Sequence, residues 1–540
     1  MARISKTAIA TLLKMEYNGK NVIKKKEVCD LFSKIISSGN LGINGYTVFV
    51  ECDVSNGMPS FEIVGLGDSA VKESRERVRS ALKNSGFDFP VKRITVNLAP
   101  ANLKKEGSVY DLAIAAGILA STGQLKTGGL QKIMFLGELA LDGRIRHVNG
   151  VLPMVFSAAG EGIARVILPE DDAGEASVMK SMAVTPVSSL REAVDMINGV
   201  IPFADRRFDE NAFQNPPEDG DFDFAEVKGQ GYAKRALEIA ASGGHNLLMT
   251  GSPGTGKTLL AKCMPGILPD MNADEAIEVT RIYSVAGLLP PGTQIIRRRP
   301  FRNPHFSISA SSLIGGGRIP KPGELSLSHN GVLFLDEVAE FSINALNSLR
   351  QPLEDRSVCI SRVNGTLDFP ANVSVIAAAN PCKCGYCMDD SKKCVCSHEQ
   401  IRAYRSKLSG PLIDRIDLLL EMTAVRYSDI TDPEEPENSA AVKSRVAAAR
   451  DMQADRYSSF GIRTNSQLTH NLLPEFCRLD DKAEKVLRKA FEKFSLSARS
   501  YVKILKVART AADLDSSDDI SPRHVSEAVQ FRCFESKWGI

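Results

Sequence analysis

Residues 251–258 read Gly251-Ser252-Pro253-Gly254-Thr255-Gly256-Lys257-Thr258 and fit the phosphate-binding pattern G-x-x-x-x-G-K-[ST]. The apolar stretch 246–250 just before them predicts a buried strand that leads into this loop. In such a loop the glycines let backbone N–H groups turn toward phosphate oxygens, the lysine places a charge on the β- and γ-phosphates, and the threonine hydroxyl ligates magnesium. A glycine-rich loop can arise by chance, but the order strand, loop and helix favours nucleotide binding.

A second apolar strand ends in two adjacent carboxylates. Residues 332–335 are Val-Leu-Phe-Leu, and Asp336 and Glu337 follow them. We expect Asp336 to hold magnesium and Glu337 to polarise the water that attacks the γ-phosphate. Asn380 ends the next apolar strand, where its amide could orient that water. The alternatives are that the acidic pair caps the next helix and that Asn380, which precedes a proline, is a turn residue.

The composition is that of an ordinary globular protein with several domains. The 540 residues are 43% hydrophobic, and 67 Lys and Arg against 65 Asp and Glu give a formal net charge of +2. A surface that binds nucleic acid would therefore have to be local. No apolar run approaches the ~18–20 residues that span a bilayer, and the N-terminus lacks the pattern of a signal peptide. We expect no membrane partner and a cytoplasmic location.

Changes in pattern divide the chain into regions. The predicted regions are a basic extension without an assigned role (1–31), an α/β domain (32–200), an acidic linker (201–224), a second α/β domain (225–427) and a helical C-terminal region (428–540). The elements expected in the first α/β domain are strands at 44–50 and 91–98 and helices at 68–84 and 111–122. The strands expected in the second are 247–250, 331–335 and 373–379, separated by helical stretches as in a doubly wound parallel sheet.

The motifs and several longer strings resemble a known family. The 251–258 loop, Asp336-Glu337, Asn380 and Asp414-Arg415-Ile416-Asp417 look like those of the AAA+ ATPases of the magnesium-chelatase group. The strings VKGQGYAKRALEIAASGGHNLLMTG, PGELSLSHNGVLFLDEVAEF, LRQPLEDRSVCISR and LSARSYVKILKVARTAADL closely resemble the YifB/ComM family, and the match covers the chain from about residue 32 onward. The resemblance implies an AAA+ P-loop core, an N-terminal Lon-protease-like α/β domain and a C-terminal helical lid.

The resemblance also assigns roles that composition alone cannot choose. It implies that Asn380 is the sensor-1 residue, that Arg415 is the arginine finger acting on a neighbouring subunit's ATP, and that Arg499 is the sensor-2 arginine of the lid. A finger used in trans requires a ring, and the AAA+ resemblance implies a hexamer. From the residues alone, Arg415 and Arg499 are cations that a phosphoryl transition state could use.

The N-terminal domain is expected to lack protease activity although it resembles the Lon protease. Lon-type chemistry needs a serine nucleophile and a lysine base. When the chain is laid on the Lon pattern, the nucleophile position falls on Val109 and the lysine position on Leu152, and neither side chain can react. Ser108 and Lys104 lie nearby in the sequence, which leaves a displaced dyad as an alternative.

Five cysteines crowd into residues 382–396. Cys382, Cys384, Cys394 and Cys396 form two C-x-C arms that could close a tetrahedral zinc site, with Cys387 left over or competing. Free thiols are the alternative, and a redox or cluster role is a third. Because this insert begins just after Asn380, a metal there would rigidify the segment next to the γ-phosphate sensor.

Two segments are candidates for holding a substrate. Residues 356–369 predict a hairpin around Asn364-Gly365, and residues 282–304 carry Arg297-Arg298-Arg299 and Arg302, which could contact phosphates without regard to sequence. A solvated basic loop or a subunit contact fits the same charge. The segments look like the helix-2 insert and pre-sensor hairpin that magnesium chelatases share with the MCM helicases.

The resemblance makes DNA the expected substrate. ComM-type proteins are implicated in DNA branch migration during natural transformation, so the leading expectation is an ATP-driven DNA helicase or branch-migration motor that needs magnesium. A protein-remodelling chaperone that uses the Lon-like domain as an adaptor is the alternative. The motor subunit of a magnesium chelatase ranks last, because the chain has no recognisable porphyrin-binding segment.

Overall fold

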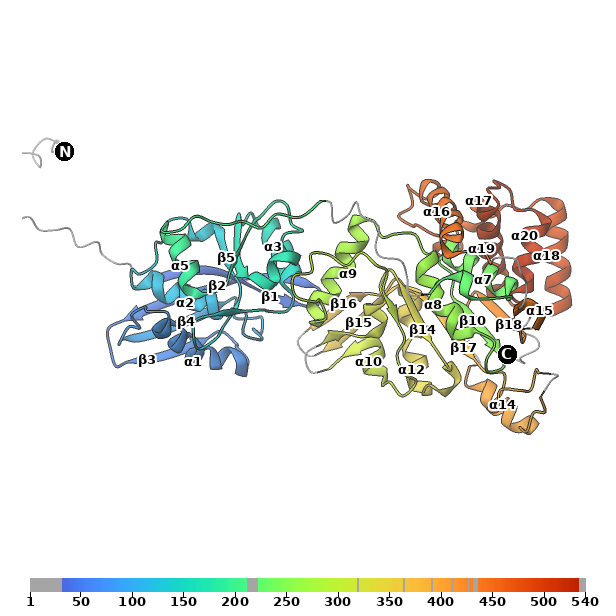
Figure 1. The fold of residues 1–540 in the computed structure, drawn as a ribbon, viewed down its shortest axis with the longest axis horizontal. Coiled ribbons are helices and arrows are strands. Elements are labelled where there is room, and N and C mark those ends of the chain that lie inside the picture. Colours follow the sequence, from blue (N-terminus) through green and yellow to red (C-terminus); the bar gives the residue numbers. More distant parts are fainter. Residues whose placement is uncertain are drawn as a thin grey trace, which may run out of the picture.

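The computed structural model describes residues 32–533 apart from 211–221, 318–319, 363–364, 390–391, 409–411, 426 and 431–435. The basic extension 1–31 therefore lies outside the described residues. Figure 1 shows an elongated molecule with the N-terminal sheet at one end, a second sheet in the middle and the C-terminal helices at the other end. None of the described helices has the length and apolar character that crossing a membrane requires.

The N-terminal domain is built on a seven-stranded mixed sheet in the order β3-β4-β2-β1-β5-β8-β9. Alternate residues of β2, such as Val48 and Val50, are fully buried, as expected for a strand with one face on a core. The strands are β1 (Phe32–Leu41), β2 (Asn44–Ser55), β3 (Ser60–Val64), β4 (Arg93–Ala99), β5 (Ile133–Phe135), β8 (Arg165–Pro169) and β9 (Ala183–Val187), with a separate pair of β6 (Glu138–Leu139) and β7 (Ile145–Arg146).

Helices cover this sheet. The side chain of Asp68 accepts a hydrogen bond from the N–H of Val71 and so begins the first helix, whereas the second helix is buried along its whole length. The helices are α1 (Ser69–Asn84), α2 (Asp111–Ser121), α3 (Val151–Gly160), α4 (Ala173–Ala176) and α5 (Leu190–Asn198). The strands and helices predicted from the sequence in this domain are present, while β1, β8 and β9 were not predicted.

The linker is shorter than the predicted 201–224. Arg206 forms a β-bridge with Val184, and Asp205 pairs with Arg165, so the residues up to 210 belong to the N-terminal domain. Phe224 is fully buried and its N–H donates to Ser439 Oγ at 2.9 Å, so the chain has already joined the following domain at that point. The boundary was missed because Phe222 and Phe224 are separated and flanked by aspartates, and two aromatic residues are too few to show a period.

The middle domain contains a five-stranded parallel sheet in the order β11-β14-β17-β10-β18. The predicted strands at 247–250, 331–335 and 373–379 are the three central ones, and β18 was not predicted. The strands are β10 (Leu247–Gly251), β11 (Phe301–Arg302), β14 (Val332–Leu335), β17 (Ser374–Ala379) and β18 (Leu418–Met422). Two short pairs, β12 (Gly315–Gly316) with β13 (Lys321–Pro322) and β15 (Ser357–Arg362) with β16 (Gly365–Pro370), lie outside it.

Helices surround this sheet, and a helical bundle follows it. The helices of the middle domain are α7 (Gly231–Gly243), α8 (Lys257–Ile267), α9 (Ala273–Ala286), α10 (Ala310–Ile314), α11 (Glu324–Leu327), α12 (Ile343–Ser348), α13 (Arg350–Asp355) and α14 (His398–Ser406). The C-terminal helices are α15 (Tyr427–Ile430), α16 (Ser439–Arg456), α17 (Leu473–Phe476), α18 (Asp481–Phe494), α19 (Ala498–Leu514) and α20 (Pro522–Gln530). The C-terminal helices, hereafter the lid, share one hydrophobic cluster with α7, α8 and β10, so lid and sheet are packed together.

Helix α9 joins the middle domain to the N-terminal one. Arg281 on α9 donates to the carbonyl of Ile43 at 2.9 Å, and Ser284 donates to Glu175 Oε2 at 2.5 Å. The N–H of Gly292 just beyond α9 donates to the Asp171 carbonyl at 2.9 Å. A movement of α9 would therefore displace the N-terminal domain through these hydrogen bonds.

Candidate nucleotide site

The predicted phosphate loop connects the buried strand β10 to the start of α8. Gly254 and Gly256 have φ of +85° and +90°, a left-handed conformation that L side chains rarely adopt. Lys257 and Thr258 begin α8, so their side chains and the first N–H groups of the helix face the same place. The local sequence produces this shape because an apolar strand, two glycines and a helix follow one another directly.

Lys257 links this loop to the strand beside it. Its Nζ donates to the carbonyls of Gly251 at 2.6 Å and Ser252 at 3.0 Å, and to Asn380 Oδ1 at 3.3 Å. Burial lowers the pKa of Lys257, and the nearby carboxylates of Asp336 and Glu337 oppose that shift. A buried ammonium in this position is suited to a polyanionic ligand.

The two predicted carboxylates follow β14 at the same edge of the sheet. Thr258 Oγ1 donates to Asp336 Oδ2 at 2.9 Å, which places a hydroxyl and a carboxylate side by side as magnesium ligation requires. Glu337 is exposed and its backbone is left-handed, with φ of 49°. A non-glycine residue in that conformation is uncommon and is found preferentially at functional sites. The structure thus brings the loop, Asp336, Glu337 and Asn380 together.

Arg415 and Arg499 lie elsewhere. The carbonyl of Arg415 accepts a hydrogen bond of 2.9 Å from Asn246 Nδ2, just before β10, whereas the phosphate loop follows the end of β10. Five strand residues separate the two edges by roughly 16 Å. Arg415 is paired with Glu354, and Arg499 with Asp414, the residue before Arg415. Both arginines therefore stand at the edge opposite their own phosphate loop, and their acidic partners had no signal in the sequence.

Comparisons with known proteins agree with this arrangement. The family described as magnesium chelatase, subunit ChlI matches residues 223–430, its C-terminal family matches 436–532, and the family described as subunit ChlI of Mg-chelatase matches 50–172. Competence protein ComM of Haemophilus influenzae is 42% identical over 503 residues, which cover 92% of this chain and 97% of that protein. The chain belongs to the YifB/ComM family. The uncharacterized protein YifB of Escherichia coli is 39% identical over 92% of this chain and 96% of its own length.

Membership of the YifB/ComM family makes the chain a magnesium-chelatase-like AAA+ ATPase, for which ATP and magnesium are the expected ligands. A more distant likeness is to DNA replication licensing factor Mcm2 of Drosophila melanogaster, which is 28% identical over 208 residues, or 36% of this chain and 20% of that one. The stretch shared with Mcm2 is much shorter than the match to the YifB/ComM proteins.

Four of the five clustered cysteines converge. The Sγ atoms of Cys382, Cys384, Cys394 and Cys396 all lie within 4.8 Å of one another, with closest pairs at 3.4, 3.5 and 3.8 Å. Tetrahedral zinc with bonds of about 2.3 Å would hold its sulfurs about 3.8 Å apart, so the residues fit the metal. Cys387 is not one of these four: its thiol donates to the Pro381 carbonyl at 3.2 Å and also interacts with Cys382. The cysteine set expected from the two C-x-C arms is the set that meets.

Two arginines of the basic segment 282–304 form ion pairs within the chain. Arg299 donates to the carbonyls of Pro269 and Asn330 and pairs with Glu275 at 2.9 Å, and Arg302 pairs with Glu324 at 2.6 Å. Both arginines are held by carboxylates distant in sequence, which favours a structural role for them, and their contact with phosphates stays a prediction. Arg298 is exposed. The hairpin β15–β16 forms as predicted, with Asn364 outside the described residues.

The candidate protease residues of the N-terminal domain do not form a dyad among the described contacts. Val109 and Leu152 are both buried. Ser108 donates to Glu138, whereas Lys104 pairs with Glu106 at 2.6 Å. The hydroxyl and the amine are thus each held by a different carboxylate.

Proposed function

We propose that this ATPase works as a ring, a hexamer as the AAA+ resemblance implies, and acts on DNA as a helicase or branch-migration motor of the ComM type. The observation that carries the ring is the position of Arg415. Arg415 lies at the end of β10 opposite the phosphate loop, and the strand between the two ends is about 16 Å long, so this arginine is placed to serve an ATP on an adjacent copy. The pocket would then be complete only between two subunits.

In the proposed pocket, the backbone N–H groups of Gly251–Thr258 surround the phosphates and Lys257 neutralises the β- and γ-oxygens. Thr258 and Asp336 hold magnesium, which would screen phosphate charge when bound. Glu337 orients the attacking water with the help of Asn380. Arg415 and Arg499 approach from the next subunit and stabilise the charge that develops on the γ-phosphate.

DNA is proposed as the substrate on two grounds. One is the family likeness to a competence protein, together with the weaker likeness to a replication licensing factor. The other is the hairpin β15–β16, which stands outside the sheet and begins directly after Arg356, close to Arg415. A change at the intersubunit pocket can therefore be passed to the hairpin over a short path. Because Arg299 and Arg302 are held internally, we assign the main DNA contact to the hairpin.

We further propose that the N-terminal domain, residues 32–210, is Lon-protease-like in fold and does not cut peptide bonds. Ser108 and Lys104 have different carboxylate partners, so the lysine base that Lon-type chemistry needs is not placed at the serine. Because α9 of the motor contacts the N-terminal domain, we assign this domain the role of an adaptor that moves with the motor.

Zinc is proposed at Cys382, Cys384, Cys394 and Cys396, on the sulfur separations given above. The thiolates would hold the metal in a structural site with no position open for chemistry. The insert 382–396 starts two residues after Asn380, so a rigid insert would fix the amide that faces Lys257.

Mixed rings test the shared pocket. Lys257→Ala and Arg415→Ala should each abolish hydrolysis, and an equimolar mixture should recover about a quarter of wild-type turnover, because about one interface in four joins an intact loop to an intact arginine. Arg499→Ala should also be rescued by Lys257→Ala and should not be rescued by Arg415→Ala. The opposite pattern for Arg499 would place that residue in its own subunit's pocket. Absence of rescue in every mixture would refute the shared site.

The substrate is tested by the ATPase rate in the presence of single-stranded, duplex and branched DNA. We expect stimulation by DNA in the wild type, and ATP binding without turnover in Glu337→Gln. Stimulation by an unfolded protein and by none of the three DNAs would instead identify a protein-remodelling motor.

A further inference from the structure

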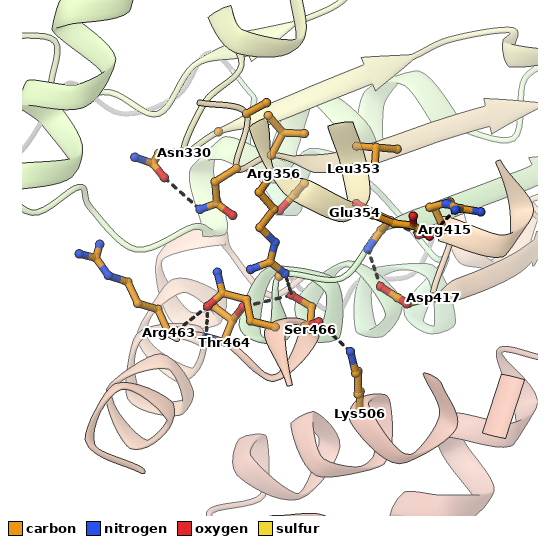
Figure 2. Close-up of a pocket in the computed structure, with 18 of the residues that line it drawn as sticks. Asn330, Leu353, Glu354, Arg356, Arg415, Asp417, Arg463, Thr464, Ser466 and Lys506 are labelled. Carbon is orange, nitrogen blue, oxygen red and sulfur yellow. Dashed lines mark hydrogen bonds and ion pairs between the residues drawn. The ribbon is translucent and has the colours of Figure 1, made fainter. Parts of the chain in front are cut away.

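A cavity of about 300 Å³ lies between the middle sheet and the lid, at the edge away from the phosphate loop (Figure 2). Its sheet wall contains Asn246, just before β10, and Ser374, the first residue of β17. Its lid wall contains Ser466 and Lys506 of α19. The phosphate loop follows the opposite end of β10, so this cavity is separate from the chain's own phosphate loop.

The wall of the cavity is strongly basic. Seven of its lining side chains are arginine or lysine and four are aspartate or glutamate. Three of the four carboxylates pair with arginines: Glu275 with Arg299 and Arg463, Glu354 with Arg415, and Asp414 with Arg499. Asp417 lies 3.5 Å from His245, and its charge also acts on Arg356, Lys503 and Lys506. One carboxylate among these three cations leaves an excess of positive charge in the wall.

Three of the cations, Arg356, Arg450 and Lys506, form no ion pair with any residue that the structure describes. Their hydrogen bonds go to neutral oxygens. Arg356 donates to Ser466 Oγ at 3.4 Å, Lys506 to the Ser466 carbonyl at 2.9 Å, and Arg450 to the Ala241 carbonyl at 2.6 and 2.9 Å. Figure 2 shows Arg356 from the sheet side and Lys506 from the lid converging on Ser466.

These cations also repel one another. Burial lowers the pKa of Arg450 to about 9, the charges of Arg299 and Arg356 add to the effect, and the carboxylate of Glu275 opposes it. Burial and the charge of Arg356 likewise lower the pKa of Lys506, while the carboxylate of Asp417 opposes that shift. Buried cations that outnumber their counter-charges are costly, and an anion placed among them would offset that cost.

We propose that this cavity is a second ligand site that binds a small anion carrying phosphate groups, held by Arg356, Arg450 and Lys506. Planar guanidinium groups and an ammonium supply several donors to one tetrahedral oxyanion, which is the arrangement that recognises phosphate. The volume suits pyrophosphate or the phosphate end of a nucleotide. The site does not depend on the proposed DNA activity.

Occupancy would connect two parts of the molecule. Arg356 immediately precedes β15 of the hairpin, whereas Arg450 and Lys506 belong to the lid helices α16 and α19. An anion held by all three would tie the base of the hairpin to the lid. Arg415 lines the same cavity, so the tie lies next to the residue proposed to act on the neighbouring ATP.

Calorimetric titration of the full chain with pyrophosphate tests the proposal. The background carries Lys257→Ala to weaken the phosphate loop. We expect one bound pyrophosphate per chain, and a dissociation constant raised about tenfold or more by adding Arg356→Gln or Lys506→Met. The matched control removes two exposed lid charges, Lys485→Met and Lys489→Met, and should bind as the background does. Unchanged affinity in the cavity variants overturns the proposal. A second outcome also overturns the proposal: the background protein binds a 12-nucleotide single strand but no pyrophosphate, and the cavity variants lose binding to the strand. That outcome would identify the cavity as a site for a nucleic-acid strand.

Thermal unfolding separates a ligand site from a structural role. Without an anion, Lys506→Met should unfold at the wild-type temperature or above it, because one of three repelling charges is gone, and protection by pyrophosphate should disappear. A purely structural role for Lys506 predicts a lower midpoint with protection retained, and that result would refute the anion site.

Discussion

Gly385 of the cysteine-rich insert lies directly against Pro253 of the phosphate loop. A Cβ atom added to Gly385 would come within 2.6 Å of Pro253 Cδ, which is closer than two carbons can approach. Gly385 also has a φ of +87°. The backbone of the insert therefore packs against the ring of Pro253 with no room for a side chain at Gly385, and a change in one segment has to displace the other.

Gly385→Ala should weaken ATP binding about five- to tenfold, because the new methyl group pushes the loop away from the phosphates. Titration with a fluorescent ATP analogue measures the change. The control is Gly461→Ala, which has a similar φ of +67° but open space around the added carbon. Equal affinities in the two variants would mean that the contact with Pro253 does not matter.

Removal of the proposed zinc should act through the same contact. We expect about one zinc per purified chain, no zinc in Cys394→Ser, and a reduced ATPase rate in that variant because the insert loosens against Pro253. Cys387→Ser is the matched control: Cys387 belongs to the same insert but is not one of the four convergent cysteines, so this substitution should leave the metal content unchanged. Mass spectrometry measures the zinc content of each protein. Zinc retained in Cys394→Ser, or absent from the wild type, would contradict the proposed zinc site.

Features that depend on residues adjacent in the sequence were predictable from the sequence. The phosphate loop, Asp336, Glu337 and Asn380 each follow an apolar strand, and parallel strands bring their carboxyl ends to one edge. Strand β1 was missed because it carries buried serines, whose polarity hides the pattern. Ser33 and Ser37 satisfy their hydroxyls on the carbonyls of Gly117 and Phe135, residues far along the chain.

Pairing between distant charges was not predictable. The sequence shows three consecutive arginines at 297–299 and suggests a single basic surface, yet Arg299 is held by Glu275 and Arg298 is exposed. The cavity cations Arg450 and Lys506 come from two separate lid helices. No spacing rule connects such residues, because the packing of lid on sheet decides which of them meet.

Arg299→Gln should lower the free energy of unfolding by about 3 kcal/mol, because it leaves Glu275 and two carbonyls without their buried donor. Arg298→Gln removes the same charge from an exposed side chain and should stay within about 0.5 kcal/mol of the wild type. Denaturant unfolding gives both values. A fully stable Arg299→Gln protein that loses stimulation by DNA would restore this residue as a DNA contact.

Glu175 should make the junction between the N-terminal domain and α9 sensitive to pH. It is buried, and it accepts hydrogen bonds from the Leu152 N–H at 3.0 Å and from Ser284 on α9 at 2.5 Å. Burial raises the pKa of Glu175 to about 7, and the charge of Asp172 acts in the same direction. The folded protein therefore keeps a proton that the unfolded chain releases near pH 4.5. The resulting stability is fully present below that pH and is lost as the pH rises through about 7.

Glu175→Gln removes this titration while keeping an oxygen that can accept both hydrogen bonds. Relative to the wild type, the variant should gain stability between about pH 4.5 and pH 7, by up to about 3 kcal/mol, and hold that gain above pH 7. Thermal unfolding at pH 5, 7 and 8.5 measures the difference. Glu76→Gln, an exposed carboxylate on α1, is the control and should show a difference that does not change over this range. A constant difference for Glu175→Gln as well would mean that Glu175 is ionised at the junction throughout, with its charge accommodated by Ser284 and the Leu152 N–H.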